Sequence, residues 1–252
     1  MALFSDGEIC SIEDLRAYES SILDAASEEG VDVTVKLALA QREVGSEIYR
    51  FLVAQTAVHN EIPTIGLPQV FVSEELRQWH ALRTLALTFR DAHYNQLNDR
   101  YKVKWAEYDK EASRAAVRYL EIGVGIVSRP SSRAMAPTIT AVPGVASPGM
   151  FEVRVTWLNA FGQEGSLSER TVFNTQDGSV AVVDGRMQPG DGTSFNVYAG
   201  PLGGAVTKQN STPVLWAQTW GSPATGFMTG ARATGGQKPD FYLRKSRTSL
   251  RG

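Results

Sequence analysis

Residues able to carry chemistry are sparse in this sequence. Its three histidines are His59, His80 and His93, and Cys10 is its single cysteine. A nucleophilic triad needs a histidine within reach of a serine or cysteine and an acid, but no G-x-S-x-G elbow accompanies these histidines. His80 and His93 lie thirteen residues apart, which matches neither an i,i+4 metal pair nor an H-E-x-x-H motif. We interpret them as helix-packing residues. A lone cysteine excludes an intrachain disulfide and a cysteine-based zinc site.

Acidic residues form two adjacent pairs and one regularly spaced set. Glu28–Glu29 and Glu74–Glu75 could serve a glycosidase, but they fall at the end and the start of expected helices, where solvated acids are common. Asp177, Asp184 and Asp191 recur every seven residues, a spacing that differs from the EF-hand calcium loop. The sequence therefore predicts no catalytic residue, no metal ligand and no cofactor. We expect a protein that is not an enzyme, with a hydrolase using Glu or Asp as the enzymatic alternative.

The first half of the chain is predicted to be helical. Apolar residues recur every three or four positions over Ile12–Glu28 and over Thr34–Gln55, which indicates two amphipathic helices. A Pro- and Gly-containing loop is expected at residues 59–72, and residues 73–122 contain neither Gly nor Pro. We favour two packed helices there, bent around Asn95–Asp99, over one helix of about 70 Å. Aromatic residues form one seam, for packing in a bundle or at a subunit interface, that includes Trp79, Phe89, Tyr101, Trp105 and Tyr108.

The composition changes at Arg129, where a stretch rich in Pro, Ser, Ala and Gly begins. Such a stretch predicts a domain boundary. Beyond it, Met150–Asn159 alternates apolar and polar residues with the period of a half-buried strand. Turn-forming residues separate further short strands, and together they predict a β-sandwich. The further strands are expected at Ile139–Val142, Ser168–Asn174, Ser179–Val183, Ser194–Ala199 and Leu215–Trp220.

Charge divides the chain in the same place. Residues 1–125 hold 20 acids and 13 bases, whereas residues 126–252 hold 7 acids and 12 bases. The stretch from Arg232 to Gly252 has six bases and one acid, and we interpret it as a mobile or partner-ordered tail. A protein partner is favoured over nucleic-acid phosphates, because no helix has a basic face. The residues expected to bind are Phe241, Tyr242, Arg244, Lys245, Arg247 and Arg251.

Several helical segments carry a resemblance to a known family. They are Asp14–Tyr18, Lys36–Ala40, Glu43–Gly45, Leu85–Ala92 and Leu97–Tyr101, with Trp105 and Tyr108. Over roughly residues 10–127 the chain resembles the head–tail adaptor, or connector, proteins of tailed bacteriophages. The resemblance implies that about a dozen copies form a ring beneath the portal and extend the DNA channel toward the tail. An acidic first half suits this role, because negative charge would not hold passing DNA by its phosphates.

The second half resembles a different kind of module. Val153–Trp157, followed by Asn159–Gly165 and Ser168, is similar to a strand–turn–strand segment of fibronectin type III or immunoglobulin-like modules, and Phe195–Gly200 resembles a later strand. Simple adaptors end after the helices, so the role of this module is not implied by the adaptor family. Widening of the ring, contact with a neighbouring protein and exposure to the medium are the alternatives.

The expected fold is therefore a multidomain α+β protein. Its parts are a helical adaptor domain at 1–128, a linker with the first strand at 129–149, a fibronectin III/Ig-like sandwich at 150–231 and a basic tail at 232–252. We expect a structural virion protein of the neck, assembled in the bacterial cytoplasm as a homo-oligomeric ring of twelve subunits, with the portal and tail or neck proteins as partners. DNA passes without specific recognition. No signal peptide or membrane span is expected. The alternative is a phage surface protein whose sandwich binds a host glycan through Trp157, Trp216 and Trp220.

Overall fold

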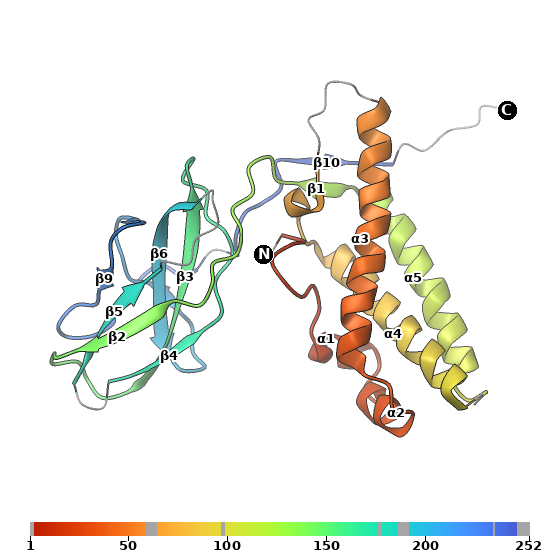
Figure 1. Ribbon diagram of the computed structural model, residues 1–252, viewed down its shortest axis with the longest axis horizontal. Helices are drawn as coiled ribbons and strands as arrows, with labels where there is room; N and C mark the ends of the chain where they lie inside the picture. Colours follow the sequence, from red (N-terminus) through yellow and green to blue (C-terminus); the bar gives the residue numbers. More distant parts are fainter. Residues whose placement is uncertain are drawn as a thin grey trace. The chain divides into compact units, whose positions relative to one another are not determined.

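The chain forms two compact units that exchange their terminal segments (Figure 1). The computed structural model describes residues 3–58, 65–96, 99–175, 178–185, 192–233 and 235–245. A helical unit comprises residues 7–128 and the described residues from Pro239 onward, and a β unit comprises residues 3–6 with residues 129–238. The predicted change from helix to sheet is confirmed. The predicted domain bounds are corrected at both ends, because each terminal segment lies in the unit formed by the opposite half of the sequence.

The first predicted helix is divided in two. Helix α1 is Ile12–Tyr18 and helix α2 is Ile22–Glu28, where the sequence pattern predicts one helix. A capping box between Ser11 and Asp14 starts α1, and the backbone becomes extended at Glu19. Polar side chains explain the break, since the Glu19 carboxylate accepts a hydrogen bond from Ser21 Oγ at 2.7 Å and such local bonds compete with the helix.

Three long helices follow and form the body of the helical unit. They are α3 at Val33–Val58, α4 at Glu74–Gln96 and α5 at Lys102–Ile122, with a short 3₁₀ helix, η1, at Leu67–Gln69. The Asp32 carboxylate caps α3 by accepting from the backbone N–H groups of Thr34 and Val35. Two helices after residue 73, rather than one, are confirmed. Helix α4 lies between α3 and α5 and is buried along most of its length (Figure 1).

A short antiparallel sheet closes the end of α5. Gly123, at φ 123°, ends the helix, and the chain continues into β1 at Val124–Ile126. Strand β10 at Phe241–Leu243 pairs with β1, so that Val124 lies opposite Leu243. On its other edge β1 accepts a hydrogen bond from Phe71 N–H to Gly125 O. Residues from the predicted tail therefore form a strand of the helical unit.

The β unit consists of two antiparallel sheets, and five of its predicted strands form at or close to the expected residues. The predicted strand Leu215–Trp220 is instead two strands in different sheets, because a turn closed by Gln218 N–H and Leu215 O redirects the chain. One sheet has the order β2-β5-β9, with β2 at Thr138–Val142, β5 at Val180–Asp184 and β9 at Trp220–Gly221. The other has the order β4-β3-β6-β7, with β8 also on β6, and comprises β3 at Met150–Asn159, β4 at Thr171–Asn174, β6 at Gly192–Pro201, β7 at Thr207–Lys208 and β8 at Val214–Leu215.

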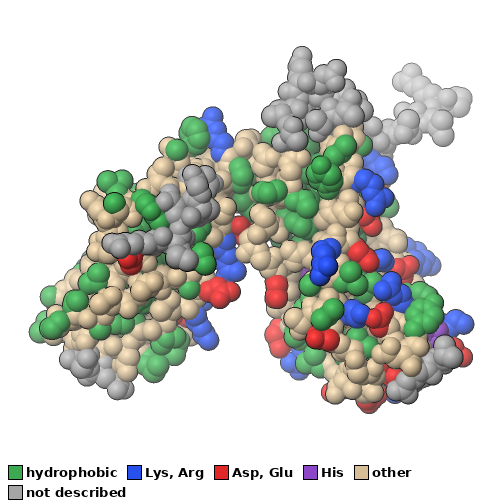
Figure 2. Space-filling model, viewed as in Figure 1, with side chains coloured by type: hydrophobic (Ala, Val, Ile, Leu, Met, Phe, Trp, Pro, Cys, Tyr) green, Lys and Arg blue, Asp and Glu red, His purple; other side chains and the backbone are tan. Residues whose placement is uncertain are grey.

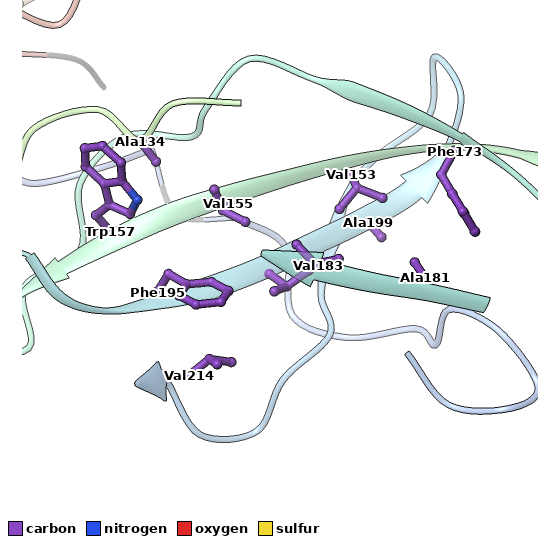
Figure 3. Close-up of a cluster of buried hydrophobic side chains, with 11 residues drawn as sticks. Ala134, Val153, Val155, Trp157, Phe173, Ala181, Val183, Phe195, Ala199 and Val214 are labelled. Atoms are coloured by element: carbon purple, nitrogen blue, oxygen red, sulfur yellow. The ribbon is translucent and has the colours of Figure 1, made fainter. Parts of the chain in front are cut away.

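Both sheets contribute to one buried hydrophobic cluster (Figure 3). Val155 and Trp157 come from β3, Val183 from β5 and Phe195 from β6. Successive residues of a strand point to opposite faces, so the inward residues of both sheets meet in one core. The arrangement is that of two sheets sharing a core, as expected for a sandwich.

The N-terminal residues are held by the β unit through one carboxylate. Asp6 accepts hydrogen bonds from Leu3 N–H at 2.8 Å, from Arg133 N–H at 2.9 Å and from Ser166 Oγ–H at 2.7 Å. Leu3 and Phe4 are buried. The first residues described are thus anchored both by apolar burial and by charge-assisted hydrogen bonds.

Candidate partner-binding surfaces

Four of the predicted binding residues of the tail lie near the C-terminal end of helix α5, and they are Phe241, Tyr242, Arg244 and Lys245. Phe241 and Tyr242 belong to β10, and their side chains are 39% and 49% exposed. The backbone N–H of Lys245 donates to Leu120 O at 2.9 Å, and the Arg244 side chain lies against Gly123. Positive charge near a helix C-terminus is favourable, because the helix dipole is negative there. Arg247 and Arg251 lie outside the described residues.

The predicted aromatic seam packs within the helical unit. Trp79, Phe89 and Tyr101 are buried, whereas Trp105 and Tyr108 are partly buried. The Phe89 ring stacks on Tyr108 with a centroid distance of 5.6 Å and also contacts Tyr101 at 5.8 Å. These contacts join α4 to α5, so the seam stabilises the subunit itself. These rings therefore pack inside the helical unit, and a role of the seam at a subunit interface stays a prediction.

Interhelical ion pairs fix the three long helices in register. Arg83 of α4 contacts Glu43 of α3 at 2.6 Å and Asp109 of α5 at 2.8 Å. Lys36 of α3 also pairs with Asp91 of α4. Each of these pairs is partly exposed, so each contributes about 1 kcal/mol or less to stability. Their value lies in connecting neighbouring helices at defined positions.

A second polar cluster joins the α1–α2 junction to α5. Glu19 accepts hydrogen bonds from Lys104 Nζ at 2.6 Å and from Tyr108 OH at 3.3 Å. Burial alone would raise the pKa of Glu19, but the hydrogen bonds from Lys104, Ser21 and Tyr108 hold it below its ordinary value. Burial and the neighbouring Glu19 carboxylate raise the pKa of Tyr108 to about 12. The cluster thus keeps Glu19 charged and Tyr108 neutral at physiological pH.

The outward sides of α3 and α5 carry exposed apolar residues. On α3 these are Val35, Tyr49 and Val53, and on α5 they are Val103 and Val117. The two sets belong to different helices, and each of these helices packs on α4. Figure 2 shows hydrophobic side chains over the helical unit, interspersed with both signs of charge. We call the two sets of residues the α3 row and the α5 row. Val103 is the most exposed of the five residues, at 72%.

A groove runs beside α5 within the helical unit. Its volume is about 280 Å³. Its lining combines apolar side chains of α4 and α5 with charged side chains from α3, α4 and the segment after β10. The groove is lined by Glu47, Trp79, Arg83, Ala112, Ser113, Ala116, Val117, Leu120 and Lys245. This groove was not foreseen from the sequence, because Lys245 and Glu47 are almost two hundred residues apart in the chain.

The histidines and the cysteine show packing roles where they are described. His80 is buried, and its Nε2 lies 3.1 Å from Leu37 O. Burial lowers the pKa of His80. His93 stacks on Trp105, whereas His59 lies outside the described residues. Cys10 Sγ donates to Arg77 O, and burial, with Asp14 nearby, raises the pKa of this thiol to about 12. A buried thiol with a raised pKa is a poor nucleophile.

Within the part of the chain that the structure describes, no group of three or more His, Cys, Asp or Glu side chains could hold a metal ion. Glu74 and Glu75 begin α4 as expected, and Glu28 bonds to Arg100 and Tyr101. Of the three regularly spaced aspartates only Asp184, in β5, is described.

The tryptophans considered for glycan stacking pack against the core of the β unit. Trp157 is buried, and Trp216 contacts it edge to face at 6.5 Å. Trp220 stacks on Phe227 with an interplanar angle of 11°. Sugar binding of the expected kind needs open aromatic faces. These rings pack against the core, so the ring faces that meet the core cannot also stack on a sugar.

Comparisons with protein-family models, with curated proteins and with solved structures give no match to this chain. Within the described ranges, no helix is both long enough and apolar enough to cross a membrane.

Proposed function

We propose that this chain is a non-enzymatic structural protein of a tailed bacteriophage virion, a head–tail adaptor that forms a ring between the portal and the tail. The ring continues the DNA channel, and DNA passes through it without specific recognition. The β unit is a fibronectin III/Ig-like module carried by each subunit. Two antiparallel sheets with a shared core support that last assignment.

The observation that carries the proposal is that α3 and α5, the two long helices packed on α4, each carry a row of exposed apolar residues. A head-to-tail ring needs two different surfaces on each subunit, one for each neighbour. In the proposal the α3 row and the α5 row, which expose valines on two different helices, serve as these two surfaces. Contact between the α3 row of one copy and the α5 row of the next closes the ring.

The basic C-terminal residues are assigned to portal contact. Strand β10 presents Phe241 and Tyr242 partly exposed, and Arg244 and Lys245 follow directly. Aromatic residues and arginine are enriched where proteins bind one another. Because β10 pairs with β1, the strand fixes the point from which Arg244 and Lys245 follow.

Electron microscopy and native mass spectrometry of the full chain with the portal protein of the same virus test the ring. We expect closed rings seated on the portal. Val53→Glu places a charge in the α3 row and should abolish them, whereas Val145→Glu, at an exposed position of the β unit, should leave them intact. A chain that stays single in the presence of the portal overturns the proposal, and rings that survive Val53→Glu refute the role of the α3 row.

A shorter truncation than removal of the whole predicted tail tests portal contact. Deletion of residues 238–252 would remove β10 and so damage the helical unit, and loss of attachment could then reflect loss of fold. A chain ending at Lys245 keeps β10 but lacks Arg247 and Arg251. Loss of two charge-assisted contacts should weaken portal attachment about tenfold. Unchanged attachment would remove the basic end from the interface while leaving the ring unaffected.

A further inference from the structure

A pocket lined by α4 and α5 is formed by different residues from the groove described above. Its volume is about 170 Å³. Leu82 of α4 and Ala115 of α5 are its buried apolar residues. Polar side chains complete the lining, and two of them are arginines of α5. The polar residues are Gln78, Glu111, Arg114 and Arg118. We call this site the diarginine pocket.

The polar α5 residues of the pocket share one face of the helix. Glu111, Arg114 and Arg118 follow one another at spacings of three and four, so their side chains lie one above another along α5. The two arginines start from adjacent turns, about 6 Å apart along the helix axis. Because α5 packs along α4, the backbone that carries both arginines is held in place.

Both arginines of the pocket are unpaired in the described part of the chain. There, neither the Arg114 nor the Arg118 guanidinium has an ion-pair or hydrogen-bond partner. Like charges one turn apart on a helix destabilise it by about 0.2–0.5 kcal/mol. In the same unit Arg83, by contrast, contacts two carboxylates. A bound anion would supply the opposite charge that the two arginines lack.

The lining favours a carboxylate over other anions. Arginine donors form a planar fork that matches a carboxylate or a phosphate. Two arginines against one glutamate give the lining a net charge of +1, which balances one carboxylate and not a dianionic phosphate. Leu82 and Ala115 offer apolar contact to the methylene groups of an acidic side chain.

The surroundings of the pocket favour a protein over a nucleic acid. The Arg244 side chain lies against Gly123, the residue that ends α5, and Arg118 precedes that glycine by five positions. The pocket is therefore close to the basic residues assigned to portal contact. Glu74 and Glu75 begin α4, which runs antiparallel to α5. A row of phosphates along a strand would meet these acids, whereas one acidic side chain can enter the pocket between them.

We propose that the diarginine pocket binds the carboxylate of a single aspartate or glutamate side chain of a partner protein. The guanidinium groups of Arg114 and Arg118 hold the carboxylate, and the Gln78 amide supplies a further donor. Glu111 limits the site to one negative charge. The inference rests on the proposed function for the identity of the partner, which is then the portal. The pocket sets the register of docking, because it accepts one side chain at a fixed position on α5.

Nuclear magnetic resonance titration of the full chain tests the pocket without the portal. The probe is the peptide Gly-Gly-Glu-Gly-Gly, blocked at both ends, and the matched control peptide has Gln in place of Glu. We expect the Glu peptide to shift the signals of Gln78, Arg114 and Arg118 at low salt. It should bind about fivefold more tightly than the Gln peptide, because its hydrogen bonds are charge-assisted.

Paired variants locate the binding. Arg114→Gln with Arg118→Gln should weaken binding of the Glu peptide about tenfold. Arg42→Gln with Arg50→Gln removes the same charge from exposed positions of α3 and should leave binding unchanged. Glutamine and arginine have similar helix propensities, so both variants keep their helices. Glu111→Gln removes the acid of the lining and should strengthen binding of the Glu peptide.

Three results would overturn the proposal. They are equal binding of the two peptides, equal losses in the two paired variants, and tighter binding of inorganic phosphate than of the Glu peptide at the same signals. The last result would assign the pocket to phosphate groups. A chain that binds the Glu peptide in the pocket but forms no ring on the portal supports the pocket and refutes the proposed function.

Discussion

Substitution of Gly123 by Ala should loosen the joint between α5 and β10. Gly123 has φ 123° and ψ 142°, a backbone conformation that residues other than glycine rarely adopt. A Cβ at this position would lie 2.9 Å from Arg244 Cγ, 3.1 Å from Tyr242 Cβ and 3.3 Å from Leu243 O. The methyl group therefore meets both an unfavourable backbone and the strand that closes the helix end.

The two effects can be estimated separately. Backbone strain at such a position costs about 1–3 kcal/mol. Displacement of β10 would also weaken the hydrogen bonds from Asp240 N–H to Ile126 O and from Lys245 N–H to Leu120 O, each with a net contribution of about 1 kcal/mol. We expect the free energy of unfolding of the helical unit to fall by about 4 kcal/mol.

Gly30→Ala provides the matched control in the same unit. Gly30 has φ 65° and closes α2 in a Schellman motif, and nothing lies within 4 Å of a Cβ placed there. Its substitution costs only the left-handed backbone conformation, about 1–2 kcal/mol. Urea unfolding followed by helical circular dichroism compares the variants. If Gly123→Ala loses no more stability than Gly30→Ala, the close approach of β10 to the helix end contributes nothing and the reasoning fails.

Two further predictions concern Asp6 and His80. Asp6→Ala removes three hydrogen bonds that hold the N-terminal segment, and it should destabilise the β unit by about 2–3 kcal/mol. Tryptophan fluorescence during urea unfolding measures this change. Unchanged stability of the variant would contradict the prediction. Burial lowers the pKa of His80, so below about pH 6.5 the unfolded chain binds a proton that the folded chain does not, and stability falls as the pH decreases. His80→Gln should flatten the dependence of stability on pH between about 7 and 5. An identical slope in the variant would assign that dependence to other groups.

Local patterns in the sequence predicted the parts of the fold that depend on neighbours in the chain. Apolar periodicity identified the helices after residue 73, and the Asn- and Asp-rich segment near residue 97 marked the division between them. Alternation in Met150–Asn159 predicted β3 to the residue. In each case the period of buried residues follows from the geometry of a single element. The division between α1 and α2 was missed because the apolar period continues across it, while side-chain bonds from Glu19 decide the backbone.

Contacts between distant segments could not be predicted in the same way. Strand β10 contains only three residues, and its charged surroundings are typical of a tail. Its pairing depends on β1, which lies more than a hundred residues earlier. The groove depends on the same pairing, since Lys245 reaches its rim only when β10 is in place. Composition reports what a segment prefers in isolation, and it carries no information about a partner strand elsewhere in the chain.

The exchange of terminal segments determines how the two units can be separated experimentally. Residues 129–238 alone would lack Asp6, whose carboxylate holds Arg133 and Ser166, and residues 7–128 alone would lack β10. Each unit thus depends on residues encoded at the far end of the chain. A fragment that loses binding would therefore report loss of fold as readily as loss of an interface. Cutting after Lys245 separates these effects, because it removes the basic end and preserves every strand described here.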